Sequence, residues 1–184
     1  MKKANYFITA AATKYWKKEV KGGNLRIATT EEKIYILNGY NAFVIPNNKY
    51  IFADLVQPAT MRPAPEVGRA HIWINGNMSE GSAKETTDIV DRILSADTAA
   101  VKRTQFTVDT TNGDNLRIYK LESGKIVGIN SKYDSMIDFR IPCTSTMATP
   151  RTPAVFVSAD ITAIICPVHL GKLEEWAQAL TEGI

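Results

Sequence analysis

The chain has 184 residues, of which 45% are hydrophobic and 22% are charged. These proportions are ordinary for a folded globular protein and exclude a chain that is disordered throughout. The length allows one large domain with a sizeable core. The formal net charge of +3 permits contact with nucleic acid without requiring it, so what matters is whether the basic residues gather on one face.

The cysteine content and the lack of sorting signals indicate a cytoplasmic protein. Cys143 and Cys166 lie far apart in the sequence among apolar residues, which is typical of buried reduced thiols rather than of a disulfide. The sequence shows no apolar N-terminal segment with a cleavage site and no apolar run long enough to span a bilayer. We therefore expect a cytoplasmic location and no membrane partner.

An amphipathic helix is predicted over residues 5–20. Its apolar side chains recur at helical spacing and would share one face: Ile8, Ala11, Ala12, Tyr15 and Trp16. A second set at the same spacing is basic and would share the other face: Lys14, Lys17, Lys18 and Lys21. Gly22 and Gly23 would then end the helix. Such a basic face is either an ordinary solvated surface or a surface that contacts phosphate groups, and both interpretations stay open.

Consecutive strands are predicted next. Apolar residues, alternating or continuous, predict strands over residues 25–27, 34–36, 42–45, 50–56 and 71–74. Asn38-Gly39 and Asn75-Gly76 are turn signals. Residues 57–68 contain three prolines and are predicted to form a loop.

The second half of the chain repeats this alternation. Ser82-Ala83-Lys84-Glu85 has the form of a capping box and predicts a helix that ends near residue 96. Strands are predicted over residues 105–110, 115–121 and 125–129, a short helix over 131–137, and two further strands over 154–158 and 161–167. Residues 144–153 read as a linker. A C-terminal helix over residues 170–180 would have this apolar stripe: Leu173, Trp176, Ala177 and Leu180.

The predicted fold class is α+β, with antiparallel sheets and helices packed on one face. Tight hairpin turns between successive strands imply antiparallel pairing. A parallel, doubly wound sheet would need a helix after each strand, and the sequence lacks that pattern.

No catalytic residue, metal site or cofactor is predicted. The sequence contains two histidines, His71 and His169, and no Cys/His spacing that suits zinc, no phosphate-binding glycine loop and no nucleophile elbow. Residues three apart on a strand point to opposite faces, which argues against a dyad of Cys166 and His169. Asp109 and Asp114 flank a predicted hairpin turn, where acids usually serve the turn itself. We therefore expect a binding protein rather than an enzyme.

Residues 125–170 resemble a known family. Residues 125–133, Lys-Ile-Val-Gly-Ile-Asn-Ser-Lys-Tyr, followed by Met136-Ile137, are similar to the segment of the bacterial DNA sliding clamp, the beta subunit of DNA polymerase III, that enters the second helix of its last domain. Residues 152–157 and 161–166, and then Pro167-Val168-His169-Leu170, resemble the clamp's closing pair of strands and its tail. Cys166 stands where the clamp has methionine, and His169 where it has arginine. Residues 36–42 resemble a clamp strand turn more weakly.

The resemblance implies antiparallel sheets outside and helices inside, around a hole through which duplex DNA passes. The lysines of the first helix would then contact DNA phosphates without reading sequence: Lys14, Lys17, Lys18 and Lys21. It also implies that Pro167, Val168 and Leu170 border a cleft that takes peptides of replication proteins. It divides the chain into residues 1–78, a helix plus antiparallel strands; residues 79–170, a clamp-like βαβββ unit; and residues 171–184, an amphipathic helix that the clamp tail lacks.

Two functions stay open. The chain is much shorter than a three-domain clamp subunit, so a ring would need more copies, and we expect a homo-oligomer. A compact chain of this kind is expected in the DNA replication of a phage or prophage, as a processivity or recruitment factor. The alternative is a protein-interaction or assembly module that uses the same fold without touching DNA, with the C-terminal helix as its contact surface.

Overall fold

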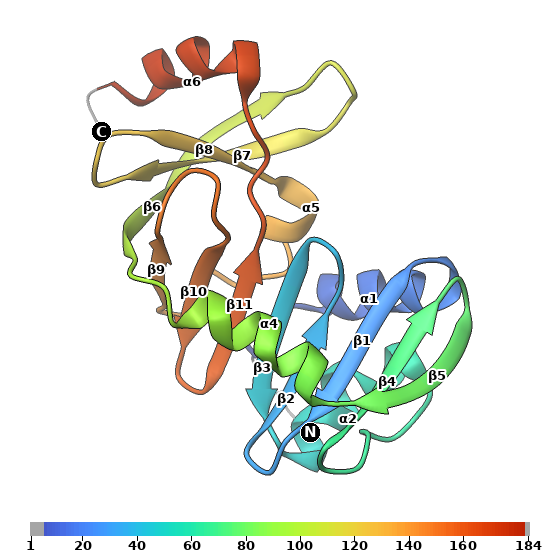
Figure 1. Cartoon of the computed structure of the whole chain (residues 1–184). Coiled ribbons are helices and arrows are strands. Elements are labelled where there is room, and N and C mark those ends of the chain that lie inside the picture. The colour runs from blue at the N-terminus through green and yellow to red at the C-terminus, as the bar shows by residue number, and fades with distance from the viewer. Residues whose placement is uncertain (1–5, 183–184) are drawn as a thin grey trace.

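The computed structural model describes residues 6–182, within which eleven strands form one antiparallel sheet (Figure 1). The strands of its first half are β1 (Asn24–Thr29), β2 (Lys33–Leu37), β3 (Asn41–Pro46), β4 (Arg69–Ile74) and β5 (Asn77–Ser82). The strands of its second half are β6 (Ala99–Asp109), β7 (Asn115–Leu121), β8 (Ile126–Asn130), β9 (Thr144–Met147), β10 (Ala154–Ser158) and β11 (Ile161–Ile165). The order across the sheet is β5-β4-β1-β2-β3-β11-β10-β9-β6-β7-β8. This arrangement confirms the antiparallel α+β class.

Six α-helices accompany the sheet in the described part of the chain. They are α1 (Ala10–Gly22), α2 (Lys49–Leu55), α3 (Gln57–Thr60), α4 (Lys84–Leu94), α5 (Ser131–Asp134) and α6 (Glu174–Thr181), the last preceded by a 3-10 turn at Gly171–Leu173. No helix within residues 6–182 has the length and apolar character needed to cross a membrane.

The central pair of strands joins two units of the same topology. β3 pairs with β11 in the middle of the sheet. On one side α1 precedes β1, β2 and β3, which lie in that order toward the centre, and on the other side α5 precedes β9, β10 and β11 in the same way. The chain therefore contains two helix–three-strand units arranged about the β3–β11 pair, which brings α1 and α5 together on one face.

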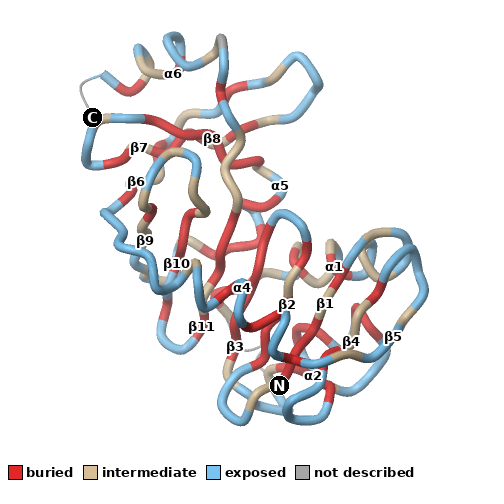
Figure 2. The backbone as a smooth tube through the Cα atoms, viewed as in Figure 1, coloured by how far each residue is buried: buried red, intermediate tan, exposed pale blue. Residues whose placement is uncertain are grey.

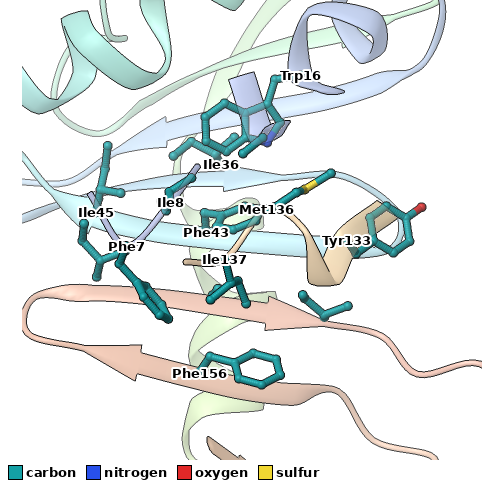
Figure 3. Close-up of a cluster of buried hydrophobic side chains, with 14 of the residues drawn as sticks. Phe7, Ile8, Trp16, Ile36, Phe43, Ile45, Tyr133, Met136, Ile137 and Phe156 are labelled. Atoms are coloured by element: carbon teal, nitrogen blue, oxygen red, sulfur yellow. The ribbon is translucent and has the colours of Figure 1, made fainter. Parts of the chain in front are cut away.

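The main hydrophobic core lies on the face that α1 and α5 cover. Strand residues such as Ile34 and Phe43 point to this face, because neighbouring residues of a strand point to opposite sides. Trp16 of α1 and Tyr133 of α5 pack over them, and the Trp16 and Phe43 rings meet edge to face at 5.3 Å between centroids. Figure 3 shows this cluster, with Phe156 of β10 at its border. The buried backbone follows the central strands (Figure 2).

The prediction that the helices pack on one face is wrong for α4 and α6. α4 crosses the opposite face of the sheet, which is the side seen in Figure 1, and its Val90 packs with Tyr35 and Val44. α6 covers the corresponding face of β7 and β8, where Ala177 packs with Leu116. The physical reason is that the strands carry apolar residues on both faces, so both faces must be covered.

Local composition misled the prediction at three elements. Most of residues 50–56, expected as a strand, lie in α2, because Asn48 caps the helix and Phe52 and Leu55 are buried at helical spacing. β5 and β9 were missed, since their sequences are largely polar. Both pair as regular strands, and β5 is one of the two edges of the sheet. The expected boundary between residues 78 and 79 falls inside β5.

The two terminal helices also differ from expectation. The helix predicted over residues 5–20 begins at Ala10, and Ile8 precedes it in an isolated bridge to Ile137. Asn5, where that helix was expected to start, lies outside the described residues. In α6 the buried positions are Ala177 and Thr181, whereas Trp176, expected in the apolar stripe, is 54% exposed.

Candidate functional site

The four predicted lysines of α1 share the exposed side of that helix. The side of α1 that faces the sheet carries Ala12 and Trp16, which are fully buried. Spacings of three and four residues place the lysines on successive turns of the outward face. We call this set the lysine face, and its members, all exposed, are Lys14, Lys17, Lys18 and Lys21.

α1 is held at several points, so the lysine face has a defined orientation. The Thr9 side chain caps the helix by accepting a hydrogen bond from the backbone N–H of Ala11 at 3.2 Å. The Thr13 hydroxyl donates to the carbonyl of Leu55 in α2 at 2.7 Å. Trp16 anchors the middle of the helix in the main core.

Few acidic residues lie near the lysine face to neutralise its charge. Glu19 is the one acidic residue of α1, and its carboxylate accepts a hydrogen bond from the backbone N–H of Asn24 at 3.2 Å. None of the four lysines forms an ion pair with another residue in the range 6–182. A face of like charges without internal partners attracts a polyanion.

Three tyrosines that were not predicted as functional residues adjoin the lysine face. Tyr15 of α1 and Tyr133 of α5 meet edge to face at 5.5 Å between ring centroids. Tyr40, in the turn between β2 and β3, stacks on Tyr133 at 6.2 Å with 22° between the ring planes. Burial, and then the hydrogen bond with the Tyr133 hydroxyl, raise the pKa of Tyr15 above its usual value. No sequence signal could have found this group, because its members lie far apart in the chain.

A pocket of about 460 Å³ lies beside the C-terminal tail. Val168 and Leu170, two of the three residues predicted to border a peptide cleft, line it, whereas Pro167 is half-buried outside its lining. Val168 is half-buried, and its backbone N–H donates to the carbonyl of Gly128 at 2.8 Å. Leu170 is largely buried against α6, so its side chain serves the fold as well as the pocket.

The rim of this pocket is mainly basic. Lys125, Arg151 and His169 are exposed on it, together with one acid, Glu174 of α6. The His169 Nδ1 accepts a hydrogen bond from the backbone N–H of Gly171 at 2.9 Å, which orients the ring. The pocket therefore combines an apolar wall with groups that attract a carboxylate.

A buried ionic network fixes α5 to the second half of the sheet. Asp134, which is buried, accepts from Arg103 Nε at 3.0 Å and from Arg103 Nη2 at 2.6 Å. The Tyr119 hydroxyl donates to the same carboxylate. Burial, and then the charge of Asp134, raise the pKa of Tyr119. This network joins β6, β7 and α5, and so holds Tyr133 in place beside α1.

The remaining polar residues do not assemble a catalytic or metal site. Within residues 6–182 no group of His, Cys, Asp and Glu side chains could hold a metal ion. The carboxylates of Asp109 and Asp114 accept hydrogen bonds from the side-chain amides of Asn115 and Asn130 at 2.8 and 2.9 Å, as turn residues do. Both cysteines are free and half-buried, and burial raises the pKa of the Cys166 thiol.

Comparison with known proteins adds a weak structural similarity. No family model matches this chain, and no curated protein matches it. Among solved structures it is similar to the DNA polymerase III subunit beta sliding clamp from Bartonella birtlesii LL-WM9, with 12% sequence identity and a TM-score of 0.33. The match covers 86% of this chain and 66% of that clamp chain. A similarity of this size leaves the function to be argued from the residues themselves.

Proposed function

We propose that this chain is a clamp-like, DNA-associated binding protein that holds DNA through the lysine face and recruits replication proteins. The contact would be to phosphates and would not read sequence. In this proposal the chain has no catalytic site of its own, works as a homo-oligomer in the cytoplasm, and serves as a processivity or recruitment factor in the replication of a phage or prophage.

The observation that carries the proposal is the lysine face itself. Four exposed lysines lie on one side of a firmly packed helix, and no described residue neutralises them. A solvated surface helix normally mixes the two signs of charge, whereas α1 carries four lysines and one glutamate. The arrangement suits the regular negative charge of a nucleic-acid backbone.

Two further features support the clamp-like interpretation. α1 and α5 lie on the same face of the sheet, as helices that line a DNA channel would. In the segment that resembles the clamp, β8 runs into α5 and β10 pairs with β11 as a closing hairpin. The resemblance and the local structure therefore agree in the order of these elements.

The pocket beside the tail is the proposed recruitment site. Val168 and Leu170 supply its apolar wall, and Lys125, Arg151 and His169 supply its basic rim. An extended peptide with one apolar side chain and one carboxylate would match both parts of this lining.

The test is DNA binding measured by fluorescence anisotropy as a function of salt. We expect log affinity to fall with log salt concentration with a slope of about −3 to −4, because each phosphate contact contributes about −0.9 and the face offers four lysines. The triple variant Lys14→Glu, Lys17→Glu and Lys18→Glu should lose most of the affinity and most of this slope.

A matched control carries the same change of charge on the other face of the sheet. The control residues are exposed on β2 and α4: Lys33, Lys84 and Arg92. Replacing these three cations by glutamate changes the net charge by the same amount as the lysine-face variant does. The control should bind DNA within a few-fold of the unmodified protein. Equal binding by the unmodified protein and the lysine-face variant would refute the proposed contact.

A second function, a protein-interaction module that does not bind DNA, is favoured by one observation. Trp176 is 54% exposed on α6, beside a pocket that Glu174 helps to line. Aromatic residues of this kind are enriched at protein interfaces. Light scattering coupled to size exclusion, with and without duplex DNA, separates the two. An oligomer that Trp176→Ala dissociates and that ignores DNA would favour the module.

A further inference from the structure

We propose that Tyr40 is a stacking platform for an unpaired base, so that the lysine face preferentially holds single-stranded DNA beside it. This inference rests on the proposed phosphate contact and goes beyond it by naming the form of nucleic acid. Its basis is the group formed by Tyr15, Tyr40 and Tyr133, with Lys132 and Asn38.

The ring of Tyr40 is supported on one side and open on the other. It stacks on Tyr133 at 6.2 Å between centroids and 22° between planes, yet remains 62% exposed. Tyr133 is buried and is itself braced edge to face by Tyr15 at 5.5 Å. An aromatic ring held in this way offers a flat face to a base without losing further side-chain freedom, and stacking on such rings is how single strands are bound.

The backbone around Tyr40 is also fixed. Its N–H donates to the side-chain carbonyl of Asn38 at 2.9 Å, and its carbonyl accepts from the backbone N–H of Cys166 at 2.9 Å. The side-chain amide of Asn38 donates to the Tyr15 hydroxyl at 2.8 Å, which links the turn to α1. These hydrogen bonds tie the turn that carries the platform to the helix that carries the lysine face.

Two cations lie near the tyrosine group. The Lys132 ammonium lies 4.7 Å from the centre of the Tyr133 ring, and Lys18 lies one helical turn beyond Tyr15 on α1. Of the acids on these helices, Asp134 is buried and paired with Arg103, whereas Glu19 lies close to the Tyr15 hydroxyl and keeps its negative charge. Lys18 and Lys132 together outweigh the single charge of Glu19, so the surface near the tyrosine group has a net positive charge that attracts a phosphate.

Tyr50 is another exposed tyrosine beside a lysine and can be compared with Tyr40. Tyr50, at the start of α2, is 70% exposed and has Lys49 5.2 Å from the centre of its ring. It stacks on no aromatic ring within residues 6–182. Single exposed aromatic residues of this kind are normal on protein surfaces. Tyr50 is therefore the matched control for Tyr40.

The experiment compares an oligothymidylate of about 16 nucleotides, within the site sizes of single-strand binders, with a duplex of the same length, by fluorescence anisotropy. Tyr40→Ala should weaken single-strand binding by about 5- to 150-fold, the effect of losing one base-stacking contact. Duplex affinity should change less than about twofold, since a paired base is not free to stack on the ring. Tyr40→Phe and Tyr50→Ala should both behave as the unmodified protein.

The outcomes separate this proposal from the one on which it rests. If the lysine-face variant loses binding while Tyr40→Ala keeps single-strand affinity, the platform is refuted and the phosphate contact stands. An equal loss for single strand and duplex in Tyr40→Ala also refutes the platform. If the unmodified protein binds neither form, both proposals fall.

A crosslinking experiment tests the platform in the unmodified protein, without any variant. The unmodified protein is irradiated with an oligonucleotide that carries bromodeoxyuridine, and the crosslinked residue is identified by mass spectrometry. We expect the crosslink on Tyr40, because a stacked base lies against that ring. Crosslinks confined to Tyr50 or to other elements would overturn the proposal.

Discussion

Replacing Gly128 by alanine should loosen the C-terminal tail. Gly128 lies in the middle of β8, buried beneath the tail, and its carbonyl accepts the backbone N–H of Val168 at 2.8 Å. A Cβ at this position would lie 2.9 Å from Leu116 Cδ1, 2.9 Å from Leu170 Cδ2 and 3.3 Å from Leu116 Cβ. Ordinary carbon contacts are wider, so the two leucine side chains must each move by about half an ångström.

The expected cost follows from this geometry. Overpacking a filled core costs about 1–3 kcal/mol. The lower entropy of alanine in the unfolded chain offsets about 0.4–1 kcal/mol of it. The free energy of unfolding should therefore fall by about 1.3 kcal/mol, the difference between the midpoints of these two ranges. Leu116 is held in β7 by the register of five residue pairs with β8, so the segment that yields is the tail that carries Leu170.

Two measurements check this expectation. Urea unfolding followed by circular dichroism should show a lower midpoint with an unchanged slope. Hydrogen exchange should show faster exchange of the α6 amides, by about tenfold for each 1.4 kcal/mol lost in docking. Gly39→Ala is the control, because a Cβ there meets nothing within 4 Å and its φ is not positive. A Gly128→Ala protein with the original urea midpoint and original α6 exchange would refute the reasoning.

Three further outcomes are expected. Asp134→Ala should lower the free energy of unfolding by about 2–4 kcal/mol, because it leaves Arg103 and the Tyr119 hydroxyl without their carboxylate. The partial exposure of Arg103 reduces this cost, since water can solvate its charge. A loss below about 1 kcal/mol in urea unfolding would contradict the network. Trp16→Ala should lower the free energy of unfolding by about 3–5 kcal/mol, whereas Trp176→Ala should lower it by less than about 1 kcal/mol. The Trp16 side chain is fully buried and the Trp176 side chain is 54% exposed. In thermal melts, Trp16→Ala should therefore unfold at a much lower temperature than Trp176→Ala. The pKa of Tyr119 is raised above 10.0 in the folded protein, so as pH rises the unfolded chain loses the Tyr119 proton before the folded protein does. The contribution of Tyr119 to stability is therefore full below about pH 10 and is lost as pH rises further. Tyr119→Phe should lessen the decline of the free energy of unfolding at alkaline pH, and an identical decline in both proteins would argue against the buried hydroxyl.

Many of the helices and strands could be predicted from the sequence, because their signals are local. Asn75-Gly76 forms a turn with positive φ at both residues, as a hairpin with an Asn-Gly turn requires. The apolar spacing in α4 identified that helix to within a few residues. The prediction failed where local composition and tertiary environment disagree. Residues 50–56 have the β-branched and aromatic content of a strand, but an asparagine cap and burial at every third or fourth position make them α2.

The candidate site divides in the same way. The lysine face could be predicted, because its four members lie on one helix and helical spacing alone decides that they share a side. The tyrosine platform could not, since Tyr15 and Tyr133 are separated by 118 residues and meet only because β3 pairs with β11. The basic rim of the pocket needs three separate segments, which carry Lys125, Arg151 and His169. The pairing of strands distant in sequence is what assembles both sites.

The placement of the charged residues, rather than the total charge, determines the strength of the proposed DNA contact. A net charge of +3 spread evenly over the surface would attract DNA weakly. Here α1 carries four lysines and one glutamate on one face, whereas α4, with three acids and two cations, and α6, with two acids, lie on the other. A helix layer on each side of a sheet separates such faces by about 20 Å, since each layer spacing is about 10 Å. The Debye length is about 8 Å at physiological salt, so the acids of the far face cannot cancel the field of the lysines. DNA should therefore approach the α1 face alone. If the Lys33, Lys84 and Arg92 control weakened binding as much as the lysine-face variant, total charge would decide the affinity, and this orientation would be wrong.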